Sequence, residues 1–211
     1  MAEYQLSCFG ESGNSYKAAL YLELVGADWE PVFVDFFSGV ARTPEYRSDN
    51  VMGEAPILRH GDVTLTQSGV ILDYLVEQFG KYGAETPAER REIWRWILFD
   101  NHKFTSYMAT RRFLLAFMKT GETPVTEFLG KRMREAWGIV EAHLKGREFL
   151  VGDRLTVADL SLSGYLHYGD ELHVDFAPYP AISAWVERIR RTPGWRHPYV
   201  LMKPARPGAT G

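Results

Sequence analysis

The feature that most constrains the fold is a change in the pattern of the chain near residue 80. Before it, short apolar runs alternate with helical patterns; the stretch from Gly80 to Pro87 then carries two glycines and one proline, and only helical patterns follow. Strands mixed with helices, followed by helices alone, indicate separate structural layers or domains. We therefore predict an α+β chain with a mixed domain over residues 1–80 and an all-helical domain over residues 87–211.

The first domain is predicted to have the order βαβαββα. Pro31 lacks an N–H for a strand ladder, which predicts that the second strand lies at a sheet edge. Gly61-Asp62 fits a tight hairpin turn. The expected strands are Tyr4–Phe9, Val32–Phe36, Ile57–Arg59 and Val63–Thr66, and the expected helices are Tyr16–Val25, closed by Gly26, Thr43–Asp49 and Ser68–Phe79.

The second domain is predicted to hold helices only. Its strongest local signal is a capping box in which Thr156 and Asp159 exchange hydrogen bonds, with Leu155 packing on Leu160. This gives Asp159 a structural role in preference to a catalytic one. The chain after Leu201, rich in proline and glycine, is expected to add little to the core. The expected helices are Glu89–Lys119, Val125–Lys145, Val157–Leu172 and Ala181–Arg191.

Composition excludes several classes of function. The net charge of -3 and a pI near 6.1 give no global attraction to nucleic acid. No apolar run approaches the roughly 20 residues that a membrane span needs. The single cysteine, Cys8, cannot form an internal disulfide, which fits a reducing cytoplasm. The histidines form no i, i+4 pair and have no cysteine partners, so no metal site is expected.

Two helix beginnings are candidate anion sites: the segment from Ser12 to Lys17 and the segment Gln67-Ser68-Gly69. The first turn of a helix offers unpaired N–H groups and the positive end of its dipole. Taken singly, Ser15 and Ser68 are better explained as ordinary N-caps, because serine is a common cap whatever the function. Glu54-Ala55-Pro56 adds a third element, because a cis peptide before Pro56 could turn the Ala55 backbone toward an extended peptide ligand.

These segments resemble the landmarks of the cytosolic glutathione transferases. The similarity rests on residues 12–17, 53–58, 67–71 and 152–159, in that order, and covers nearly the whole chain. It implies a thioredoxin-like domain, a helical domain and a homodimer. It also implies a glutathione S-transferase that uses glutathione as co-substrate and conjugates its thiolate to a small hydrophobic electrophile.

The resemblance also assigns residues to the parts of glutathione. Ala55, beside a cis Pro56, would pair with the cysteinyl part, and Gln67 and Ser68 would hold the γ-glutamyl end. Glu54 departs from the family, because many relatives place lysine there to meet the glycyl carboxylate. That contact would pass to another cation, for which Lys17, Arg42 and Arg111 are the candidates.

Catalysis requires that the thiol of bound glutathione ionise near neutral pH. A cysteine-like thiol has a pKa of about 8.5, so a hydrogen-bond donor must stabilise the anion. Aligned with the family, Ser12 is the first candidate, Asn14 the second and Ser15 the third. Tyr4 is expected in the core, and Cys8 lies too early, within the strand, for a mixed-disulfide mechanism.

The electrophile is expected to contact the inner face of the first long helix. Phe104, Tyr107, Met108 and Arg111 recur there at helical spacing, although such a stripe is as readily explained by core packing. Two alternative functions remain open. One is a glutathione-dependent isomerase or disulfide reductase of the zeta-like or nu-like kind, and the other is a noncatalytic interaction protein that keeps the fold.

Overall fold

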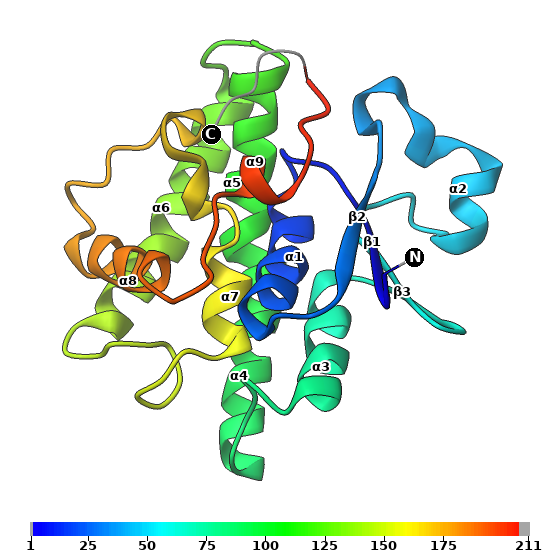
Figure 1. The fold of residues 1–211 in the computed structure, drawn as a ribbon. Helices are drawn as coiled ribbons and strands as arrows, with labels where there is room; N and C mark the ends of the chain where they lie inside the picture. The colour runs from blue at the N-terminus through cyan, green and yellow to red at the C-terminus, as the bar shows by residue number, and fades with distance from the viewer. Residues whose placement is uncertain (1, 207–211) are drawn as a thin grey trace. The chain divides into compact units, whose positions relative to one another are not determined.

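A computed structural model describes residues 2–206 of the chain (Figure 1). The chain divides into two compact units. One unit combines the residues up to Gly83 with those from Thr192 on, and the other spans Ala84 to Arg191.

The first unit contains a four-stranded mixed sheet. Its strands are β1 (Tyr4–Cys8), β2 (Trp29–Phe33), β3 (Ile57–His60) and β4 (Val63–Thr66), in the spatial order β2-β1-β3-β4. β2 runs parallel to β1, and the other two neighbouring pairs are antiparallel. β2, with Pro31 in it, lies at the sheet edge as predicted. β2 was expected over Val32–Phe36 but runs from Trp29 to Phe33, where it pairs with β1 from Tyr4 to Cys8.

Helices cover both faces of this sheet. α1 (Gly13–Val25) packs against α3 (Ser68–Phe79) on one side, and α2 (Pro44–Asp49) lies on the other (Figure 1). Two short 3₁₀ turns, Phe36–Ser38 and Val40–Arg42, precede α2. Gly26 ends α1 at a φ of 72°, which confirms the predicted glycine cap. The order of elements is the predicted βαβαββα.

The register of the sheet brings three loops to one end. Ser7 near the end of β1 pairs with Ile57 at the start of β3, and Ile57 pairs with Thr66 at the end of β4. The turn after β1, the loop before β3 and the start of α3 therefore lie at the same edge of the sheet, the one formed by the ends of β1 and β4 and the start of β3. Strand pairing thus gathers three segments that are far apart in the sequence.

Residues 192–206 pack on the rest of the first unit, contrary to the expectation that the chain after Leu201 adds little to the core. The short helix α9 (Pro198–Leu201) contacts α1, and Met202 is buried. The Tyr16 hydroxyl donates a hydrogen bond to the Arg196 carbonyl at 2.7 Å. The composition of the tail gave no sign of this packing, because its partners lie almost 200 residues earlier in the chain.

The second unit is all-helical within Ala84 to Arg191, and the α+β fold with a thioredoxin-like first unit is as predicted. The expected helix from Glu89 to Lys119 is a succession of α and π segments. The expected helix from Val157 to Leu172 is α-helical only as far as Ser163, and the 3₁₀ segment that follows is kinked at Gly169, whose ψ of -126° is not helical. The elements are α4 (Pro87–Phe99), a π segment (Asp100–Phe104), α5 (Thr105–Arg112), a second π segment (Phe113–Phe117), α6 (Pro124–Leu144), α7 (Val157–Ser163), a 3₁₀ segment (Leu166–Leu172) and α8 (Pro180–Arg190).

The predicted capping box opens α7. Thr156 and Asp159 exchange the two reciprocal hydrogen bonds. The Asp159 carboxylate also accepts hydrogen bonds from the Leu150 N–H and the Trp185 indole N–H, each at 2.9 Å. Every hydrogen-bond partner of Asp159 among the described residues is therefore structural, which supports the structural role over the catalytic one.

Candidate functional site

The amino end of α1 gathers the three candidate thiolate donors. Ser12 is the N-cap, and its hydroxyl accepts a hydrogen bond from the Ser15 N–H at 3.1 Å. Ser15 therefore lies inside the helix and is not its cap. The Asn14 side-chain oxygen and the Ser15 hydroxyl are buried without a hydrogen-bond partner among residues 2–206. Buried polar atoms are normally satisfied, so these two point to a missing polar partner.

The loop before β3 presents the second segment. The Ala55-Pro56 peptide bond is cis, as expected from the resemblance. The Glu54 carbonyl accepts hydrogen bonds from the Tyr46 hydroxyl at 2.8 Å and from the Asn50 side chain at 2.7 Å. α2 and the residues after it thus fix the backbone just before Ala55.

The third segment is the start of α3. Gln67, at the N-cap position, has a φ of 68° and makes no side-chain capping bond, while Ser68 begins the helix and is only 5% exposed. Ser68 is therefore the first helical residue and not the cap. The first N–H groups of α3 have no intrahelical partner, and the helix begins next to the end of β4, at the edge of the sheet shared with the segments of Ser12 and Ala55.

Glu54 and Gln67 contact each other across this edge. The Gln67 amide nitrogen donates to a Glu54 carboxylate oxygen at 2.9 Å and also contacts the Met52 sulfur at 2.8 Å. The bond to Glu54 orients the amide and leaves its oxygen free to accept from a ligand.

The candidate cations occupy different environments. Lys17 is fully buried inside α1, whereas Arg42 is exposed on the 3₁₀ turn before α2. Arg47 was missed by sequence reasoning: a Cβ atom built on Gly53 would lie 3.3 Å from its Nε atom and 2.6 Å from the Ala41 carbonyl. Arg47 is thus next to the loop that carries Glu54. No sequence pattern predicts that Arg47 lies near Gly53, because the two meet only where the chain at Gly53 packs against the Ala41 carbonyl.

The predicted electrophile contacts lie in the second unit, and packing accounts for most of them. Phe104 is fully buried and stacks on Trp137 with ring centroids 6.0 Å apart. Met108 is 1% exposed. Tyr107 is half-buried, with the Arg132 guanidinium 5.6 Å from its ring centre. Of these three, only Tyr107 keeps substantial surface for a ligand.

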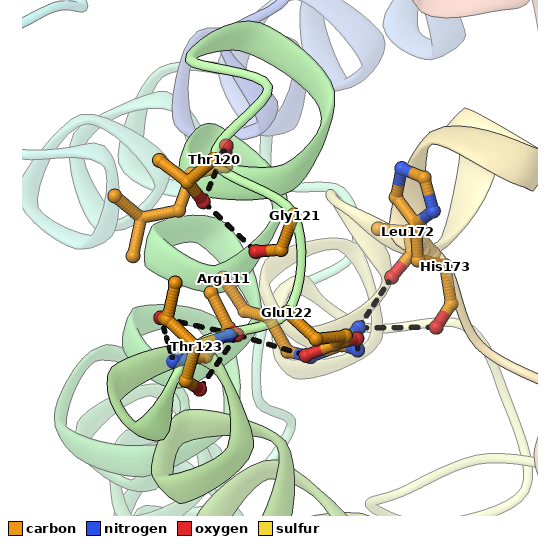
Figure 2. Close-up of polar contacts among 9 residues, drawn as sticks. Arg111, Thr120, Gly121, Glu122, Thr123, Leu172 and His173 are labelled. Atoms are coloured by element: carbon orange, nitrogen blue, oxygen red, sulfur yellow. Dashed lines mark hydrogen bonds and ion pairs between the residues drawn. The ribbon is translucent and has the colours of Figure 1, made fainter.

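Arg111 is held by protein groups. Its guanidinium donates to Glu122 at 2.6 Å and to the carbonyls of Leu172 and His173 at 3.2 and 3.0 Å (Figure 2). Its Nε atom is buried without a partner among the described residues. The arginine therefore links α5 to the end of the 3₁₀ segment, and these contacts argue against a role in holding the glycyl carboxylate.

Tyr4 and Cys8 belong to the core of the sheet. Tyr4 is 3% exposed and stacks on His60 with ring centroids 4.2 Å apart. Burial raises the pKa of the Cys8 thiol to about 12, which keeps it protonated and unreactive. Both observations agree with the sequence interpretation.

Two negative findings apply to residues 2–206 alone. No described helix is long and apolar enough to cross a bilayer. In the same stretch, no three His, Cys, Asp or Glu side chains are grouped so that they could hold a metal ion.

Comparison with known proteins gives matches to both halves of the chain. The family model of the glutathione S-transferase N-terminal domain matches residues 4–77, and that of the C-terminal domain matches residues 103–193. Glutathione S-transferase F14 of Arabidopsis thaliana is 31% identical over 95% of this chain and 84% of its own length. The probable glutathione S-transferase GSTF1 of Oryza sativa is 28% identical over 92% of this chain and 94% of its own length.

Solved structures agree with the sequence matches. A possible glutathione S-transferase from Rhodopseudomonas palustris superposes with a TM-score of 0.87 at 32% identity, covering 93% of this chain and 98% of the other. Ure2p in complex with glutathione shares the fold, with a TM-score of 0.83 at 24% identity over 92% of this chain and 96% of Ure2p. Together with the cis Pro56 and the three loops at one sheet edge, these matches show that the chain belongs to the glutathione S-transferase superfamily.

Proposed function

We propose that the protein is a glutathione transferase that ionises the thiol of glutathione at the amino end of α1 and conjugates it to a small hydrophobic electrophile. One observation carries the proposal: Asn14 and Ser15, in the first turn of the helix that Ser12 caps, keep buried polar atoms without partners among the described residues. The O and N ends of an asparagine amide exchange by a flip, so Asn14 can present a donor at the position of its unpaired oxygen. Ser12 accepts one bond and still has its own proton to donate.

The energetic requirement is modest. Lowering a thiol pKa by about two units needs roughly 2.7 kcal/mol of preferential stabilisation of the thiolate. One or two hydrogen bonds to the anion, at about 1.5 to 3 kcal/mol each, supply this amount. The helix dipole of α1 acts in the same direction, because its amino end lies at Ser12. Two donors at this turn are therefore sufficient.

The rest of the tripeptide fits the same edge of the sheet. Ala55, whose backbone N–H and C=O have no partner among the residues described, would pair with the cysteinyl backbone. Gln67 and Ser68 would hold the γ-glutamyl end through the amide oxygen and the free N–H groups of α3. For the glycyl carboxylate we propose Arg42 or Arg47, which are both exposed. Arg42 precedes α2 and Arg47 lies within it, and the Arg47 guanidinium lies next to Gly53 in the loop that carries Glu54.

The test is the pKa of the bound thiol, measured from thiolate absorbance across a pH titration of the glutathione complex. We expect a pKa about two units below that of free glutathione, and a rise toward the free value in Ser12→Ala or Asn14→Ala. Ser48→Ala is the matched control, because its hydroxyl donates to the Glu45 carbonyl within α2. A bound thiol with an unshifted pKa would refute the mechanism.

A noncatalytic binding protein is the second candidate function, and Glu54 favours it. Its negative charge lies where many relatives place lysine, and it faces the same edge as the proposed ligand. Calorimetry distinguishes the two functions: a transferase binds glutathione, whereas absence of heat on titration with glutathione would favour an interaction protein.

We also propose a cytoplasmic homodimer. Each unit exposes large apolar side chains, which are otherwise costly to leave in water. Val51 is 80% and Met52 58% exposed in the first unit, and Phe128 is 60% exposed in the second. Sedimentation equilibrium should give about twice the chain mass of 24.1 kDa. A single species of the chain mass at micromolar concentration would refute the dimer.

A further inference from the structure

The turn that leads into α1 is held in place by residues 198–206. The Ser12 N–H donates to the Phe9 carbonyl at 3.1 Å, which makes residues 9–12 a β-turn. The two central residues of this turn, Gly10 and Glu11, both bind the segment 198–206, here named the C-terminal strap. Both partners belong to the first unit.

Gly10 lies directly against the strap. Its N–H donates to the Lys203 carbonyl at 2.8 Å. A Cβ atom at position 10 would lie 2.8 Å from a Tyr199 ring carbon and 3.0 Å from the Met202 carbonyl oxygen. Only glycine permits the backbones to approach this closely.

Glu11 makes the second attachment. Its side chain has no exposed surface, and its two carboxylate oxygens accept hydrogen bonds from the N–H groups of Ala205 and Arg206, each at 2.9 Å. The Arg206 guanidinium lies 3.3 Å from the same carboxylate. A buried carboxylate needs such partners, so Glu11 and the strap fix each other.

We propose that Glu11 is a positioning residue for the thiolate site: by binding the strap, it fixes the turn that places Ser12 and Asn14 against the glutathione sulfur. The inference rests on the proposed function. Ser12 follows Glu11 directly, and its N–H closes the turn. With both central residues anchored, the turn cannot rotate, and hydrogen bonds to an anion require donors held within about 0.5 Å of the productive position. An anchor that merely stabilised the tail would leave the bound thiol unaffected.

Two variants separate these roles. Glu11→Gln keeps the size of the side chain but places an NH₂ group against one of the two backbone donors. Ala205→Pro removes one of those donors from the strap and leaves the turn itself unchanged. Glu30→Gln is the matched control, because Glu30 accepts a hydrogen bond from Gln5 on the sheet and does not contact the turn.

The readouts are the pKa of the glutathione thiol in the complex and the pH dependence of kcat and KM. We expect both variants to raise the bound thiol pKa by about one unit, which lowers kcat about tenfold below the wild-type pKa. KM for glutathione should change less than about twofold, and kcat should recover above the raised pKa. Glu30→Gln should behave as the wild type.

The outcomes distinguish this inference from the proposed function. A wild-type complex without a lowered thiol pKa defeats the proposed function and the inference with it. A lowered pKa in the wild type that is unchanged in both variants, while limited proteolysis shows the strap released, overturns the inference alone. A uniform loss of kcat at every pH also overturns it, because that pattern reports lost structure and not a displaced donor.

Discussion

Asp159→Asn tests how burial and hydrogen bonding compete at one carboxylate. Asp159 has no exposed surface, and burial raises its pKa to about 6 from the ordinary aspartate value of 3.8. Four donors act in the opposite direction, namely the N–H groups of Leu150 and Thr156, the Thr156 hydroxyl and the Trp185 indole, at 2.9 to 3.0 Å. The raised pKa means that desolvation outweighs all four.

The sign of the pH dependence follows from this shift. The folded chain binds the proton of Asp159 more tightly than the unfolded chain does. Its contribution to stability is therefore greatest below pH about 4 and declines as the pH rises toward 6. A shift of about two units corresponds to about 3 kcal/mol in total, of which about 2 kcal/mol falls between pH 4 and 7. Asparagine does not titrate and has no such dependence.

The assay is urea unfolding of the wild type and the variant at pH 4 and 7. At pH 7 the variant should be less stable by about 1 to 3 kcal/mol, because the Asn amide leaves the Thr156 N–H unpaired. At pH 4 the difference should be larger by about 2 kcal/mol. Taking the difference cancels other carboxyls, such as Glu89, whose pKa the hydrogen bond from Arg154 lowers.

Asp175→Asn provides the control, since Asp175 accepts a hydrogen bond from the Ala177 N–H on an exposed loop. Its effect should stay within about 0.5 kcal/mol at both pH values. A stability difference for Asp159→Asn that grows from pH 4 to pH 7 would refute the reasoning. It would show that the four donors lower the pKa more than burial raises it.

Three further variants or measurements test the core and the turn. Phe104→Ala should destabilise the chain by about 3 to 5 kcal/mol in urea unfolding, because Phe104 is fully buried against Trp137, while the KM for the electrophile should be unchanged. A large rise in that KM without loss of stability would restore the pocket role. Cys8 should not react with iodoacetamide at pH 8 until urea unfolds the chain, since burial raises its pKa to about 12. Gly10→Ala should cost about 1 to 3 kcal/mol in thermal unfolding, because its Cβ would overlap Tyr199; an unchanged Tm would show that the strap yields easily.

The sequence by itself determined the features that depend on neighbours within a few residues. The capping box of Thr156 and Asp159 and the glycine cap at Gly26 are closed by contacts over three or four positions, so the local pattern contains every partner. The alternation of strands and helices, and the change to helices alone after Gly80, follow from periodicity. The segments of the candidate site can be recognised as separate motifs because each consists of a few consecutive residues.

Only the tertiary structure decided which distant groups meet. Strand register brought Ser12, Ala55 and Gln67 to one edge of the sheet and set the start of β2 at Trp29. Packing placed Phe104 inside the helical core. It also buried Glu11 against backbone N–H groups almost 200 residues later. Such contacts depend on the path of the whole chain, and neither the residue type nor its neighbours in the sequence specify the partner.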